Sequence, residues 1–246
     1  MLKLFDSHAH LDEILDLKKS IKEAKEAGVI GILAVGSDPE SNKRVLEIAR
    51  EYKGYVYPAL GLHPWDLDVK VAEKGLVYLS KKVGECLAVG EVGLDYRIKL
   101  DKRLQVKVFS KVLKIAKENR RPVIIHARDA WRDSFKLVVE AGIEVAIFHW
   151  YSGPLSVLEE ILETGHYISA TPAATYQERH RRALKITPIE RILLESDAPV
   201  VYRGLKSRPV HVTLSAKGVA EVKGLDLEEV VRKTLHNVTK VFNIDL

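Results

Sequence analysis

The 246-residue sequence has only one cysteine, Cys86, so no disulfide can form within the chain and the fold depends on packing. A charge interrupts every apolar run before it reaches membrane-spanning length, and the first residues lack the basic and apolar order of a secretory signal. We therefore expect a cytoplasmic protein with no membrane partner. Nothing in the sequence indicates an obligate protein partner either.

Low-complexity segments and composition shifts are also missing, which leaves no place for a linker between domains. Hydrophobic residues make up 46 % of the chain and charged residues 30 %, a balance that excludes a disordered or fibrous protein. The formal net charge of +5 favours an anionic partner but does not by itself establish nucleic-acid binding. We predict a single domain over residues 1–246.

Short apolar runs alternate along the chain with segments of helical periodicity, such as the one that contains Leu104, Val108 and Val112. The expected strands are Lys3–Asp6, Val29–Val35, Val56–Leu60, Leu87–Gly90, Val123–Ile125, Val145–Phe148, Tyr167–Ala170 and Ile192–Leu194. Eight strands separated by helices in a chain of this length predict an α/β protein with a (β/α)8 TIM barrel. A dinucleotide-binding open sheet would need a glycine-rich turn after its first strand, where Ser7-His8-Ala9-His10 stands instead.

The segment that follows the first expected strand carries two histidines, His8 and His10. Because they are two residues apart, an extended backbone points both imidazoles to the same side. Taken alone, such a pair is as typical of a polar loop as of a metal site. The decision depends on what stands at the ends of the other strands.

Four later strands also end in ionisable residues, namely Glu91, His126, His149 and Asp197. The carboxyl ends of barrel strands share one face, so these side chains are expected to meet the two histidines there. Burying such groups singly is costly, whereas a dication satisfies several of them together. Four imidazoles and two carboxylates exceed the needs of one tetrahedral ion, which predicts a site for two divalent ions.

The same segments carry a family resemblance that covers nearly the whole chain. The motifs are DSHAHLD, GLHPW, GEVGLDY, IIHARDA, FHWYSGP and ESDAPVVYRG. In order and spacing they resemble the TatD-like metal-dependent deoxyribonucleases. The resemblance implies that one ion is held by His8, His10 and Asp197, that the other is held by His126 and His149, and that Glu91 bridges them.

Two divalent ions of this kind support phosphodiester hydrolysis, with Asp197, Glu91 and His63 as the expected catalytic residues. Asp197 can orient the attacking water and accept its proton. His63 ends the third expected strand and can reach a phosphate or the leaving oxygen. The ligand types admit Zn, Mn, Fe or Ni, whereas the resemblance argues for activity with Mg or Mn. It also favours a DNA exonuclease of 3′-to-5′ polarity, and a narrow barrel mouth favours single-stranded or frayed DNA ends.

Several residues beside the expected ligands are candidates for substrate contact. Ser152 and Gly153 can offer hydroxyl and backbone donors, and Arg203 can pair with a phosphate. Trp150 and Trp65 adjoin motif histidines and can stack on a base. Each of them is also compatible with a purely structural role in a loop wall.

Two aspartates, Asp95 and Asp129, are expected to orient ligand histidines through the remote ring N–H, or else to cap helices. The run Arg179–Arg182 is compatible with a nucleic-acid contact or with a solvated helix face. The remaining histidines lack strand-end positions, and we expect them to be surface or packing residues; they are His166, His180, His211 and His236.

Two other functions are compatible with parts of this pattern. The same metals on the same barrel can hydrolyse a small ester, a lactone or an aminoacyl-tRNA. A non-enzymatic binding barrel is the remote alternative, and it would be expected to lack one or more of the ligands. All six expected ligands are present in the sequence.

Overall fold

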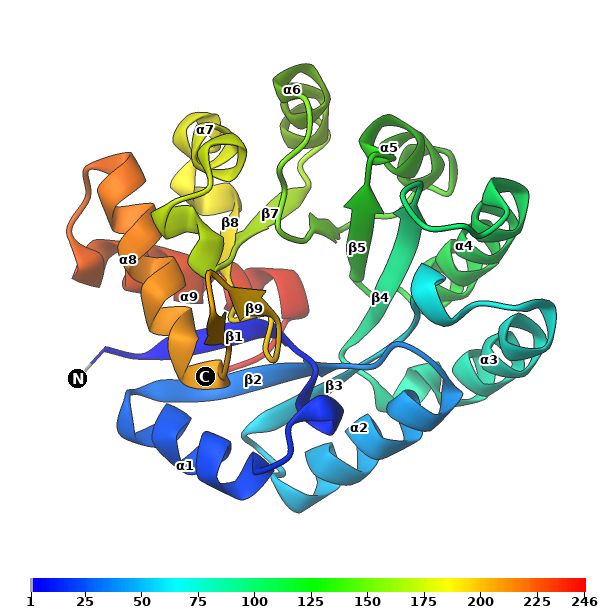
Figure 1. Cartoon of the computed structure of the whole chain (residues 1–246), viewed down its shortest axis with the longest axis horizontal. Helices are drawn as coiled ribbons and strands as arrows, with labels where there is room; N and C mark the ends of the chain where they lie inside the picture. The colour runs from blue at the N-terminus through cyan, green and yellow to red at the C-terminus, as the bar shows by residue number, and fades with distance from the viewer. Residues whose placement is uncertain (1) are drawn as a thin grey trace.

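The computed structural model describes residues 2–246, with only the backbone described at residue 66. Eight parallel strands form one sheet in the order of the chain, with helices around it (Figure 1). The strands are β1 (Leu4–Ala9), β2 (Val29–Val35), β3 (Val56–Leu62), β4 (Ala88–Asp95), β5 (Val123–Arg128), β6 (Ala146–Phe148), β7 (Tyr167–Ala170) and β8 (Ile192–Leu194). This arrangement confirms the predicted (β/α)8 barrel.

The barrel closes through the segment that follows β8. The backbone N–H of Asp197 donates to the carbonyl of His8 at 2.9 Å, and the N–H of His10 donates to the carbonyl of Ala198 at 2.7 Å. Between the two strands themselves, the hydroxyl of Ser7 in β1 donates to the carbonyl of Leu194 in β8 at 2.8 Å. The closing contacts thus run through residues of two of the expected site segments.

Four strands extend further than the apolar runs predicted: β3 continues to Leu62, and the extensions of the other three include candidate ligands. β4 continues from Gly90 to Asp95, β5 continues to Arg128, and β1 continues to Ala9, so Glu91, His126 and His8 lie within strands and not after them. The polar residues that close each apolar run can stay in the sheet because their side chains meet at a common buried site. The sequence placed these three residues directly after their strands, and that expectation was therefore wrong.

The outer layer consists of helices α1 (Leu17–Glu26), α2 (Pro39–Glu51), α3 (Val69–Lys82), α4 (Lys102–Glu118), α5 (Trp131–Glu140), α6 (Leu155–Glu163), α7 (Glu178–Ile186), α8 (Val212–Lys223) and α9 (Leu227–Phe242). Aspartate side chains cap the N-termini of four of them, α1 to α4, by accepting a backbone N–H of the first turn; these are Asp16, Asp38, Asp68 and Asp101. Such caps fix the residue at which each of these helices begins.

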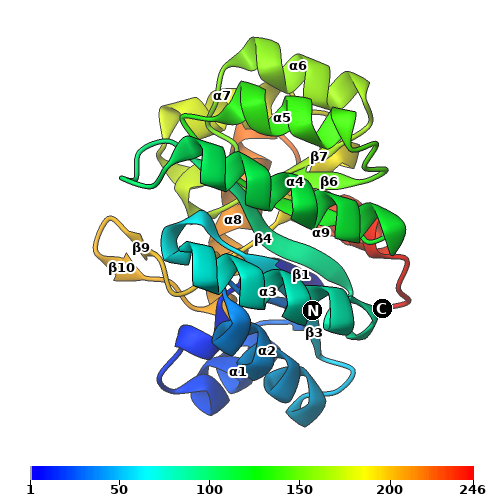
Figure 2. The same ribbon diagram turned by 90° about the vertical axis from the view of Figure 1, so that its right-hand side faces the viewer.

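Apolar side chains of the strands and helices pack into the core, and α9 covers β1 and β8. Phe242 of α9 lies against Phe5 of β1, with ring centroids 6.4 Å apart. A hairpin of β9 (Val201–Tyr202) and β10 (Leu205–Lys206) projects from one end of the barrel, opposite the end where both termini lie (Figure 2). Among the described residues, no helix is both long and apolar enough to cross a membrane.

Candidate metal centre

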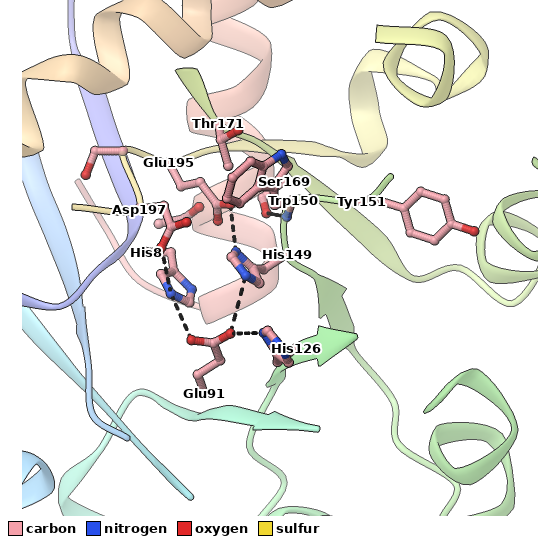
Figure 3. A network of polar contacts seen from close by, with 12 residues as sticks. His8, Glu91, His126, His149, Trp150, Tyr151, Ser169, Thr171, Glu195 and Asp197 are labelled. Atoms are coloured by element: carbon pink, nitrogen blue, oxygen red, sulfur yellow. Dashed lines mark hydrogen bonds and ion pairs between the residues drawn. The ribbon is translucent and has the colours of Figure 1, made fainter. Parts of the chain in front are cut away.

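Glu91 lies at the centre of a buried cluster of imidazoles at the carboxyl end of the barrel (Figure 3). Its Oε2 is 3.3 Å from Nε2 of His8 and 3.3 Å from Nε2 of His10. Its Oε1 is 2.9 Å from Nδ1 of His126 and 3.3 Å from Nε2 of His149. The two oxygens of one carboxylate therefore face two different pairs of histidines.

The first pair forms a compact set of ligand atoms with Glu91. Nε2 of His8 and Nε2 of His10 are 3.2 Å apart. Three donors at separations of 3.2 to 3.3 Å match the edge of a tetrahedron with metal bonds of ~2.0–2.1 Å, which is ~3.3 Å long. Oδ1 of Asp197 is 3.6 Å from Nε2 of His8 and 4.0 Å from Nε2 of His10, so it lies on the same side. The expected residues thus fit a divalent ion here.

The second pair is oriented by carboxylates on the far side of each ring. Oε1 of Glu195 is 3.0 Å from Nδ1 of His149, and Oδ2 of Asp95 is 3.3 Å from Nε2 of His126. With the remote N–H donated to a carboxylate, the nitrogen that faces Glu91 is the one that can bind an ion once it has released its proton. This arrangement is typical of histidines that bind a metal, and Asp95 supplies one of its two carboxylates.

Among the side chains that the structure describes, three groups of donors lie close enough to hold an ion, and they share members. They are His8 with His10 and Glu91, His63 with Glu91 and His126, and His8 with His149 and Glu195. His63, assigned to substrate contact from the sequence, is thus also within reach of an ion, with its Nε2 3.6 Å from Oε1 of Glu91.

Two glycines allow the strands that carry these residues to approach one another. A Cβ on Gly61 of β3 would lie 2.3 Å from the carbonyl oxygen of Glu91. Gly93 of β4 has a φ of 151°, and a Cβ there would lie 1.9 Å from the carbonyl oxygen of His126. Any side chain at either position would push apart the backbones that hold the cluster.

The carboxylates make the cluster favourable for positive charge. Burial opposes protonation of His10 and His149, but Glu91 and the neighbouring carboxylates raise their pKa values to about 9 and about 10. Burial would likewise raise the pKa of Glu91, yet the charge of His149 and the other imidazoles around the carboxylate hold it well below the ordinary value. Protons on imidazoles here neutralise buried carboxylates, which is the role that divalent cations take in such clusters.

His63 differs from the other members because burial outweighs its carboxylate neighbour. Its pKa is lowered to about 4, so the ring is neutral at neutral pH. Its Nδ1 accepts the backbone N–H of Trp65 at 3.2 Å, which leaves the proton on Nε2. His63 therefore presents a hydrogen-bond donor to the cluster.

Sequence reasoning missed Glu195 and Asp6, although both stand in quoted motifs. The Asp6 carboxylate accepts from the backbone N–H of Ser196 at 2.8 Å and from its hydroxyl at 2.5 Å, and so fixes the segment between Glu195 and Asp197. Both carboxylates are buried, at 1 % exposure or less. Both carboxylates adjoin apolar strands in the sequence, and a buried carboxylate there indicates a polar partner. From the sequence, we considered only the acidic residues that follow a strand in line with the expected ligands.

Above the cluster opens a cavity of about 1240 Å³. His63, Trp150, Ser152 and Gly153 line it, as the predicted substrate contacts require. Trp65 also lines it and remains 57 % exposed, while its indole N–H donates to Oδ2 of Asp95 at 2.6 Å.

Two predicted residues have other partners than expected, although Asp129 is also part of the cavity lining. Asp129 pairs with Arg97 at 2.9 Å and is mostly exposed, so it does not orient a ligand histidine; its left-handed φ of 53° turns the chain away after β5. Arg203 is exposed, with its guanidinium 4.1 Å from the ring centroid of Tyr176, and it is not among the residues that line the cavity. The expectation for Asp129 is corrected because the loop backbone, and not sequence proximity, aims its side chain. The phosphate contact of Arg203 stays a prediction.

The side chains of the basic run Arg179–Arg182 face different sides of α7, because successive residues of a helix point in different directions. Arg179 and Arg182 line the cavity, whereas Arg181 pairs with Glu221 at 2.7 Å. His180 points inward, where Nδ1 donates to a backbone carbonyl at 2.7 Å and Nε2 accepts the Thr171 N–H at 3.3 Å. This confirms the expectation that His180 is a packing residue.

Comparisons with known proteins agree with this geometry. A family model described as TatD related DNase matches residues 5–243. The uncharacterized metal-dependent hydrolase YabD of Bacillus subtilis is 33 % identical over 98 % of this chain and 100 % of that protein. The human deoxyribonuclease TATDN3 is 30 % identical over 97 % of this chain and 94 % of that protein. The crystal structure of YJJV, a TatD homolog from Escherichia coli K12, superimposes with a TM-score of 0.89 at 27 % identity and covers 98 % of both chains.

A parallel barrel with a buried cluster of histidines and carboxylates at the carboxyl ends of its strands defines a metal-dependent hydrolase. The match over nearly the whole chain then fixes the family. The chain belongs to the TatD-related DNase family.

Proposed function

We propose that this chain is a DNA exonuclease that uses two divalent metal ions and removes nucleotides from single-stranded or frayed ends. The observation that carries the proposal is the position of Glu91, whose two oxygens face separate histidine pairs. One ion would be held by His8, His10 and Asp197, the other by His126 and His149, with Glu91 shared between them. When bound, the two ions supply a water of lowered pKa and compensate charge on the phosphoryl oxygens.

The protein's own residues have distinct tasks in this reaction. Asp197 lies beside the first histidine pair and can take the proton of the attacking water. His63 is neutral, carries its proton on Nε2, and can donate a hydrogen bond to the phosphoryl or leaving oxygen. Glu195 and Asp95 hold His149 and His126 in place while the substrate exchanges.

The cavity supports a polymeric substrate. Its volume of about 1240 Å³ exceeds the ~300–1,000 Å³ usual for small-molecule pockets. Among the residues that the structure describes, Arg128 and Arg179 line the cavity without an ion-pair partner, so both are free to meet phosphates. Trp65 and Trp150 offer ring faces on which bases can stack.

Action at an end follows from the width of the substrate. The cluster is buried beneath the loops, and a duplex interior is too wide and stiff to bend into it, whereas a frayed or single strand can enter. The 3′-to-5′ polarity is expected from the family resemblance alone. Magnesium, manganese and zinc are the candidate ions.

A polarity-resolved assay tests this proposal. Linear single-stranded DNA labelled at the 5′ end should shorten stepwise in the presence of Mg²⁺ or Mn²⁺, and a circular strand of matched composition should resist. Rapid nicking of the circle by wild-type protein, but not by Glu91→Gln, would refute the need for an end. Release of a 5′-labelled mononucleotide as the first product would refute the 3′-to-5′ polarity.

The alternative substrate is a small ester, a lactone or an aminoacyl-tRNA on the same metals. Metal-dependent turnover of these esters is measured in the same preparations. A turnover well above that of single-stranded DNA would favour the alternative.

A further inference from the structure

The hairpin beside the cluster places a tyrosine hydroxyl against one of the candidate ligands. Tyr202 of β9 is only 3 % exposed, and its hydroxyl donates to Oδ2 of Asp197 at 3.2 Å. The other oxygen of Asp197, Oδ1, is the one that lies 3.6 Å from Nε2 of His8. The two oxygens therefore have different partners, one outside the cluster and one within it.

The hairpin is built so that this hydroxyl has a fixed position. Arg203 and Gly204 form a two-residue turn with φ values of 49° and 88°, the positive pair that a tight hairpin of this kind requires. At the base of the hairpin the Ser207 N–H donates to the carbonyl of Val200 at 2.8 Å. The Ser207 hydroxyl donates to the carbonyl of Ser196, also at 2.8 Å, which ties the hairpin to the residue before Asp197.

An aromatic contact also holds the tyrosine, because its ring centroid lies 5.2 Å from that of Trp150. A phenylalanine would fill the same space against Trp150, so packing alone does not account for a hydroxyl at this place.

We propose that Tyr202 is a positioning residue that holds Asp197 with Oδ1 turned toward His8 and His10, and so sets the affinity of the ion at that pair. This inference rests on the metal assignment of the proposed function. By the same logic Glu195 serves the other ion through His149, so the two ions have separate supports. Outer partners of metal ligands typically change metal affinity by ~10–100-fold when they are removed.

The test is a binding titration in proteins that retain one pair only. Tyr202→Phe is introduced into His126→Ala/His149→Ala, which keeps the first pair, and into His8→Ala/His10→Ala, which keeps the second. Mn²⁺ binding is followed by the electron paramagnetic resonance of the free ion. We expect ~10–100-fold weaker binding in the first background and no change in the second.

In the otherwise intact protein, Tyr202→Phe should lower kcat on single-stranded DNA and leave KM unchanged, because the hydroxyl faces Asp197 and not the substrate. Tyr167→Phe is the matched control: this buried tyrosine begins β7 at the opposite end of the barrel. It should bind Mn²⁺ and turn over DNA as wild type does.

Three results would overturn the inference. They are unchanged Mn²⁺ affinity in the first background, equal weakening in both backgrounds, and a fall in the melting temperature of metal-free Tyr202→Phe beyond that of Tyr167→Phe. The binding experiment contains no DNA. A protein that binds Mn²⁺ as described but leaves DNA intact would therefore contradict the proposed function and not the role of Tyr202.

Discussion

Replacement of Glu91 by glutamine removes one negative charge from the centre of the cluster and leaves the shape of the side chain nearly unchanged. Four imidazole nitrogens lie 2.9 to 3.3 Å from its two oxygens, two on each side. A unit charge at 4 Å from another is worth about 4 kcal/mol at the effective dielectric of a protein. At 1.36 kcal/mol for each factor of ten, this corresponds to roughly three orders of magnitude in affinity for a unit positive charge, and the loss is larger for a divalent ion because its charge is doubled.

The assay combines metal content with turnover. Glu91→Gln and wild type are equilibrated at the same free Mn²⁺ concentration, and bound metal and hydrolysis of single-stranded DNA are measured on the same samples. We expect loss of both ions and of most turnover, with unchanged circular dichroism. Glu85→Gln is the control, because Glu85 is an exposed carboxylate before β4, at the opposite end of that strand, where it pairs with Arg50 and Lys82.

The same substitution should also change the metal-free protein. The charge of Glu91 contributes to the raised pKa values of His10 and His149, so both values should fall in the variant. A pH titration of the imidazole signals by NMR measures both pKa values directly. More than half of the wild-type rate at saturating metal, or unchanged pKa values for both histidines, would show that Glu91 does not join the two pairs.

Three other outcomes are expected. Since the pKa values of His10 and His149 are about 9 and about 10 without metal, both rings are protonated at pH 7; metal binding should release protons, and affinity should rise with pH, which calorimetry in buffers of different ionisation enthalpy measures. The double variants His8→Ala/His10→Ala and His126→Ala/His149→Ala should each lose roughly one ion by elemental analysis, and unchanged content in either would remove that pair from the assignment. Burial lowers the pKa of His180 to about 4, below its unfolded value, so the neutral ring stabilises the fold above pH 6.5, and about 3 kcal/mol of that should be lost as pH falls toward 4. Urea denaturation at several pH values measures this change in the free energy of unfolding. An equal loss of stability in His180→Gln would show that other groups cause it.

Much of the fold could be predicted because the relevant signals are local. Alternating strands and helices, and the period of two within a strand, depend on neighbouring residues only, so the barrel and the shared direction of His8 and His10 followed from the sequence. The rule that parallel strands end on one face also brought Glu91, His126, His149 and Asp197 to one place. Strand ends were less predictable, because a polar residue such as Glu91 continues a strand when its partners lie in other strands.

What the tertiary structure decided is which atom meets which. Glu195 and Tyr202 support His149 and Asp197 through contacts that depend on the register of β8 and the turn of the hairpin. Asp129 and Arg203 carry side chains suited to the predicted roles, yet the loop backbone aims them at Arg97 and Tyr176. A distance between residues remote in sequence is set by the sum of packing, register and loop geometry. A sequence therefore indicates which groups gather at a site, while their pairing is fixed only when the barrel closes.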